Sequence, residues 1–96
     1  MRTALVNIGR IVTGDWREPV AVGDCIVCDG GAIAHVGTAD KSALAGCDVI
    51  IDAAGTTAIP GLIDSHVHIT FGDYTPRQRT VGFLESYLHG GVTTAI

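Results

Sequence analysis

The chain has 96 residues, of which 47% are hydrophobic, and a formal net charge of −4 at pH 7. This length fits one small domain or a part of a larger one. Because Lys and Arg form no cluster, and no apolar run approaches the ~20 residues of a membrane span, we expect no nucleic-acid partner and no membrane partner. The N-terminus lacks the apolar stretch of a signal peptide, which predicts a cytoplasmic location.

Residues 1–58 carry short strand patterns separated by turn signals. Strands are expected over residues 3–8, 10–13 (continuing or pairing with the first), 20–29, 32–36 and 48–52. Asp29-Gly30-Gly31 predicts a tight hairpin, since two glycines suit its turn. A short helix is expected over residues 40–45, with Thr38 as its cap. Short strands joined by tight turns indicate a small β-sandwich or barrel.

Residues 59–96 carry a different pattern. An apolar strand is followed by a helix signal at 75–78, where Thr-Pro-Arg-Gln combines a capping box with a proline at the first helical position. Apolar residues then recur at helical spacing up to Leu88, and Gly90-Gly91 ends the helix. A second apolar strand begins at Val92. Strand, helix and strand predict a βαβ unit with parallel pairing.

Two histidines follow the first strand of that unit, in Pro60-Gly61-Leu62-Ile63-Asp64-Ser65-His66-Val67-His68. On a strand, alternation would place Asp64, His66 and His68 on one face. Two imidazoles so placed can both reach one metal ion at about 2.0–2.1 Å. An isolated H-x-H pattern is more often an ordinary strand end, but the carboxyl end of a strand in an α/β unit is where ligands bind.

The three cysteines offer a competing metal or redox reading through Cys25-x-x-Cys28. Three positions along a strand place the two thiols on opposite faces, and no second ligand pair follows. We therefore interpret Cys25, Cys28 and Cys47 as small hydrophobic residues.

Four segments in this order resemble the start of the amidohydrolase superfamily, which comprises metal-dependent cyclic amidohydrolases and deaminases. They are residues 29–37, 51–55, 60–68 and 90–94. The resemblance implies mixed β plus α/β architecture: residues 1–58 as the N-terminal part of a composite β-sandwich, and residues 59–96 as the start of a TIM-like (β/α)8 barrel. It also implies that His66 and His68 bind metal. The remaining ligands and a proton-transferring aspartate would come from later barrel strands, outside this sequence.

Residues 72–78 and 88–94 extend the resemblance to the enamidase group of that superfamily. The likeness implies hydrolysis of a C–N bond in a small cyclic amide or enamide, such as 6-oxotetrahydronicotinate, by metal-activated water. The implied cofactor is one or two divalent ions, zinc first, with iron or a mixed iron–zinc pair as alternatives. The implied assembly is a homo-oligomer.

Three further residues are candidates for roles near the metal. Asp64 either orients a ligating imidazole or bonds to nearby backbone. Arg77, with Tyr74 beside it, is a candidate for substrate contact, because a guanidinium suits a carboxylate. The ordinary alternative for Arg77 is a solvated arginine in the first turn of a helix.

Two functions from different classes fit these observations. The first is the N-terminal segment of a metal-dependent amidohydrolase, inactive as 96 residues and weak in metal affinity, because two ligands fall short of a usual zinc site. The apolar run that ends the sequence at Ile96 favours this reading. The second is a free-standing small β-rich module for assembly or metal binding, without catalysis.

Overall fold

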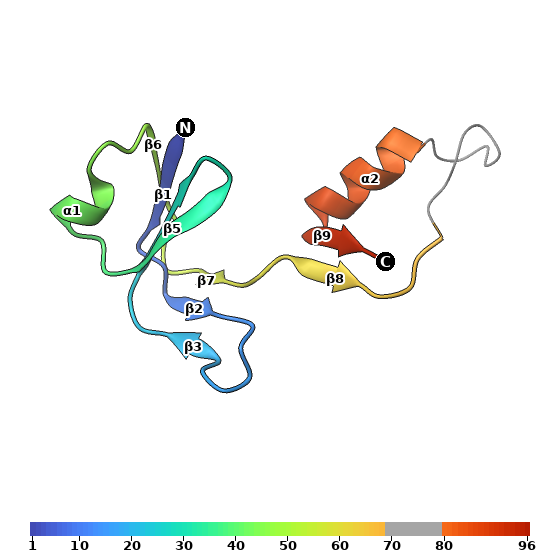
Figure 1. Ribbon diagram of the computed structural model, residues 1–96, viewed down its shortest axis with the longest axis horizontal. Helices are drawn as coiled ribbons and strands as arrows, with labels where there is room; N and C mark the ends of the chain where they lie inside the picture. The colour runs from blue at the N-terminus through green and yellow to red at the C-terminus, as the bar shows by residue number, and fades with distance from the viewer. Residues whose placement is uncertain (69–79) are drawn as a thin grey trace. The chain divides into compact units, whose positions relative to one another are not determined.

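The computed structural model describes residues 1–68 and 80–96, and the chain forms two compact units, Met1–Pro60 and Gly61–Ile96 (Figure 1). The sequence predicted the boundary between the two units to lie between residues 58 and 59. Within the described residues the fold is mostly β. The first unit contains β1 (Arg2–Val6), β2 (Arg10–Val12), β3 (Val20–Ala21), β4 (Cys25–Asp29), β5 (Ala32–Gly37), α1 (Lys41–Leu44), β6 (Val49–Asp52) and β7 (Thr57–Ala58).

Two sheets make up the first unit. One has the order β5-β4-β1-β6, in which β1 runs antiparallel to β4 and parallel to β6. The other has the order β3-β2-β7, with β2 parallel to β7. The prediction that residues 10–13 continue or pair with the first strand is therefore wrong. β2 instead pairs with β7, a partner more than forty residues later in the chain.

The core of the first sheet is formed by small side chains. Ala4, Cys25 and Val27 are fully buried, and Ala39, Leu44 and Cys47 from the segment around α1 pack against them together with Val6. All three cysteines are free thiols, and Cys28 and Cys47 are half-buried. Burial raises the pKa of the Cys25 thiol, as expected for a cysteine that serves as a small hydrophobic residue.

The turn between β4 and β5 confirms the predicted hairpin. Gly30 and Gly31 both have positive φ, +58° and +83°, the pair of angles that a two-residue turn of the primed type requires. The predicted strand over residues 20–29 is in contrast divided into β3 and β4. The break lies at residues 22–24, where Gly23 has a φ of +126°.

The short helix is capped by a residue other than the one predicted. α1 spans Lys41–Leu44, and its N-cap is Asp40, whose Oδ1 accepts a 2.8 Å hydrogen bond from the Ala43 amide. Thr38 instead uses its backbone carbonyl to accept from the Asp40 amide at 3.0 Å. The carboxylate is the better cap here because its position lets it reach the amide three residues ahead.

A second carboxylate holds the end of β6. Asp52 Oδ1 accepts hydrogen bonds from the Ala54 amide at 2.8 Å and from Asn7 Nδ2 at 3.1 Å. Asn7 and Ala54 both adopt left-handed backbone angles, with φ of +56° and +51°, which are unfavourable for residues other than glycine. These two hydrogen bonds lower the pKa of Asp52, and the bond from the Ala54 amide has the larger effect.

The turn that follows β6 is expected to become less stable as the solution becomes more acidic. Because the folded-state pKa of Asp52 lies below its unfolded value, its contribution is complete above the unfolded pKa of about 3.9 and is lost as pH falls through the folded pKa. Hydrogen-exchange protection of the Ala54 amide should therefore drop below about pH 4 in the native protein. In Asp52→Asn that pH dependence should disappear, whereas Glu18→Gln should keep it. Protection that rises as the pH falls would contradict the assignment.

The second unit contains β8 (Leu62–Asp64), α2 (Thr80–His89) and β9 (Val92–Ala95), and α2 packs beside β9 (Figure 1). β8 and β9 pair in parallel, which confirms the predicted strand pairing. The predicted capping box at 75–78 lies outside the described residues. In the part of the chain that the structure describes, no helix is long and apolar enough to cross a membrane.

Candidate functional site

His66 and His68 lie beyond the end of β8 and not on it, so their predicted position on a strand face is wrong. The strand ends at Asp64, whose carbonyl accepts from the Ile96 amide at 3.0 Å. Asp64 Oδ1 then accepts a 3.1 Å hydrogen bond from the His66 amide. A side chain that bonds the amide two residues ahead forms a turn, and this turn carries the chain out of the parallel ladder.

The two imidazoles nevertheless remain together. Their ring centroids lie 5.2 Å apart, with an interplanar angle of 76°, and both residues are exposed. Two imidazoles that share a tetrahedral zinc ion through nitrogens at about 2.0–2.1 Å have ring centres roughly 5 Å apart. The spacing and the nitrogen donors therefore fit a divalent ion of the zinc or iron type.

Further ligands are not gathered around this pair within residues 1–68 and 80–96. No group of three or more His, Cys, Asp and Glu side chains able to hold a metal ion occurs there. Structural and catalytic zinc sites use three or four protein ligands, so the two imidazoles alone are fewer than such a site needs.

Among the described residues, the Asp64 carboxylate has two hydrogen-bond partners, and neither is an imidazole ring. Its Oδ1 bonds the His66 backbone, and its Oδ2 accepts a 2.6 Å hydrogen bond from the hydroxyl of Tyr87 on α2. The Tyr87 hydroxyl is the largest cause that lowers the pKa of Asp64, followed by the His66 amide. The same hydrogen bond raises the pKa of Tyr87. The structure shows the bond to nearby backbone that one alternative for Asp64 requires, and it adds the bond from Tyr87.

Tyr87 was missed as a site residue because it fits the apolar pattern of the helix. Its ring contacts that of Phe83, with centroids 4.7 Å apart, as expected for a helix neighbour. The signal that could have found it is its hydroxyl, because a half-buried tyrosine usually has a hydrogen-bond partner. Tyr74 and Arg77, the candidates for substrate contact, lie outside the described residues.

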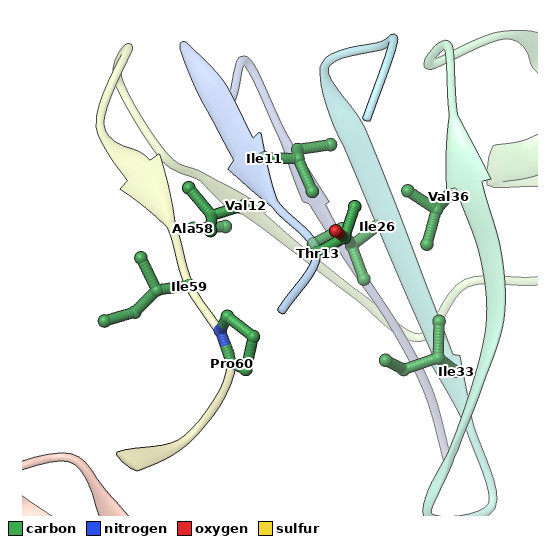
Figure 2. Close-up of a pocket in the computed structure, with 9 residues that line it drawn as sticks. All are labelled: Ile11, Val12, Thr13, Ile26, Ile33, Val36, Ala58, Ile59 and Pro60. Atoms are coloured by element: carbon green, nitrogen blue, oxygen red, sulfur yellow. The ribbon is translucent and has the colours of Figure 1, made fainter. Parts of the chain in front are cut away.

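An apolar groove of about 270 Å³ lies in the first unit. Figure 2 shows the side chains of the β7–Pro60 segment on one side of it and those of β4 and β5 on the other. The lining residues are Ile11, Val12, Thr13, Ile26, Ile33, Val36, Ala58, Ile59 and Pro60. The Thr13 hydroxyl, the one polar side-chain group among them, already donates to the Glu18 carbonyl. None of these described lining residues is therefore an acid, a base or a usual metal ligand.

Comparison with known proteins gives specific matches, although no protein-family model matches the chain. The chain is 53% identical over 95 residues to enamidase from Eubacterium barkeri. The aligned region covers 99% of this chain and 25% of the enzyme. It is 37% identical over 91 residues to imidazolonepropionase from Paenarthrobacter aurescens, covering 94% of this chain and 22% of that enzyme.

A solved structure agrees with these matches. The crystal structure of enamidase, described as a new member of the amidohydrolase superfamily, matches with a TM-score of 0.81 at 52% identity, over 99% of this chain and 25% of that one. The chain thus spans about a quarter of the length of the relatives it matches. The resemblance inferred from residues 29–37, 51–55, 60–68 and 90–94 is confirmed: the chain belongs to the amidohydrolase superfamily and corresponds to the N-terminal quarter of its enamidase and imidazolonepropionase relatives.

Proposed function

We propose that this chain acts as the N-terminal segment of a metal-dependent hydrolase that opens a cyclic amide or enamide at its C–N bond. The observation that carries the proposal is the His66–His68 pair, with ring centroids 5.2 Å apart. It follows the carboxyl end of β8 in a chain that is 53% identical to enamidase. In α/β barrels that end of the strands is where active sites lie.

In this proposal His66 and His68 hold the ion through neutral imidazole nitrogens, and zinc is the first candidate, with iron or a mixed pair as alternatives. A divalent ion supplies polarisation of an amide carbonyl and a water of lowered pKa. Asp64 fixes the backbone of His66 through its 3.1 Å hydrogen bond. The remaining ligands and the proton-transferring aspartate belong to later parts of a longer chain.

The two units receive different roles. Met1–Pro60 supplies part of a β-sandwich, and Gly61–Ile96 supplies the first strand, helix and second strand of a (β/α)8 barrel. Parallel pairing of β8 and β9 supports the barrel assignment, because parallel strands need a crossover of this kind. Arg77 and Tyr74 are proposed to contact the substrate.

The proposal predicts different behaviour for the complete gene product and for residues 1–96 alone. The complete product should contain metal and release ammonia from 6-oxotetrahydronicotinate or a related cyclic enamide, measured as ammonia formed against time. Native mass spectrometry of residues 1–96, with and without zinc, should show no stoichiometric metal. The same spectra report whether copies associate, as the sequence predicts.

The alternative function makes the opposite prediction. A free-standing module would appear as a defined oligomer of residues 1–96 that retains stoichiometric zinc, and His66→Ala would abolish that retention. Such a result, together with a complete product that leaves cyclic amides intact, would replace the hydrolase proposal.

A further inference from the structure

One carboxylate connects the helix of the second unit to the histidine pair. Asp64 Oδ2 accepts from the Tyr87 hydroxyl at 2.6 Å, and Asp64 Oδ1 accepts from the His66 amide at 3.1 Å. Tyr87 lies 23 positions after Asp64 in the chain, so the hydroxyl bond joins α2 to the end of β8. Each oxygen of the carboxylate thus has its own donor.

This arrangement holds residues 65–68, which lie just beyond the hydrogen bonds between β8 and β9. The last ladder-type bond of β8 is the one that the Asp64 carbonyl accepts from Ile96. Among the described residues, the backbone of residues 65–68 makes one hydrogen bond, from the His66 amide to Asp64. The His66 backbone is thus tied to one oxygen of the Asp64 carboxylate, and the Tyr87 hydroxyl holds the other oxygen.

We infer that Tyr87 is a positioning residue for the His66–His68 pair, acting through Asp64. The inference rests on the proposed function, since it assigns Tyr87 to the alignment of metal ligands. Tyr87 touches neither imidazole in this arrangement. Its hydroxyl sets the geometry and affinity of metal binding, while its ring packs on Phe83 and stabilises the helix.

The experiment separates the hydroxyl from the ring. In the complete gene product, Tyr87→Phe keeps the ring and removes the 2.6 Å bond. The matched control Phe83→Leu weakens the ring packing and keeps that bond. The native metal is removed and replaced by Co²⁺, whose visible absorption reports coordination geometry. Affinity is measured by competition with a chelator, and the melting temperature of the metal-free protein is recorded.

Loss of a residue that directly supports a metal ligand costs 10–100-fold in affinity, and Tyr87 acts one residue further back, so Tyr87→Phe should weaken Co²⁺ binding by at most about 10-fold and change the visible spectrum. Phe83→Leu should lower the melting temperature and leave the spectrum unchanged. Asp64→Asn should change the spectrum too. The double variant Tyr87→Phe/Asp64→Asn should bind no more weakly than Asp64→Asn alone, because both changes act on one connection.

Two results would overturn the inference while leaving the proposed function in place. One is a Tyr87→Phe protein with native affinity and spectrum. The other is an equal spectral change in Phe83→Leu, which would assign the effect to helix packing. A native protein that binds no Co²⁺, or whose binding survives His66→Ala, would overturn the proposed function and this inference together.

Discussion

Replacing both His66 and His68 by alanine is expected to strip the complete gene product of metal and of hydrolytic activity. In the proposed site the two rings, with centroids 5.2 Å apart, are the ligands that come from the described residues. Loss of a partner one step behind a ligand costs 10–100-fold, so loss of two ligands should exceed that and reduce activity by roughly 1000-fold or more. Metal per chain, by elemental mass spectrometry, and ammonia release together measure the effect.

His35→Ala is the matched control for that experiment. It removes one imidazole from the first unit, where the ring nitrogen Nε2 lies 3.3 Å from the Thr38 carbonyl oxygen. The control should retain metal and activity. Full metal content in the double variant would show that the ion binds elsewhere, and the assignment of the pair would then fail.

The largest expected loss of stability follows from Gly23→Ala. Gly23 has a φ of +126°, and a Cβ at this position would overlap the backbone carbonyl of Gly37. That carbonyl accepts the 2.9 Å hydrogen bond from the Asp24 amide, and the Asp24 carbonyl in turn accepts from Ile8 at 3.0 Å. Because backbone cannot move aside as a flexible side chain does, the substitution combines strained φ with a disrupted hydrogen-bond path. We expect a loss of about 4 kcal/mol or more.

Gly46→Ala separates the two causes. Gly46 also has a positive φ, +71°, but a Cβ there would meet nothing within 4 Å. It should therefore cost only the strain of the left-handed region, about 1–2 kcal/mol. Urea unfolding of the two variants beside the native protein, with soluble yield as a second measure, makes the comparison. Equal losses in both variants would assign the whole effect to φ and none to the approach of Gly37.

The features that the sequence predicted correctly depend on neighbours along the chain. The Asp29-Gly30-Gly31 turn depends on backbone angles that glycine readily adopts, and the break at Gly90-Gly91 depends on the same property. Parallel pairing of β8 with β9 followed from strand, helix and strand in succession. Each of these can be inferred within a window of a few residues or from the order of elements.

The features that the sequence could not provide depend on which distant segments meet. β2 pairs in parallel with β7, and β1 pairs in parallel with β6, and no local pattern encodes either pairing. The Tyr87–Asp64 bond likewise joins residues that lie far apart in the sequence, one on α2 and one at the end of β8. The placement of His66 off the strand has a local cause, the turn made by the Asp64 side chain, which competed with the alternation rule.

The edge strand β6 has a consequence for how the protein is made and kept in solution. It lies at the end of the sheet order β5-β4-β1-β6, and Val49, Ile50 and Ile51 are 39%, 54% and 48% exposed. Its run of three exposed β-branched residues is typical of segments that pair with another chain, although Asp52 ends the strand with a charge. An exposed strand edge of this type is expected to make residues 1–96 alone prone to association at high concentration.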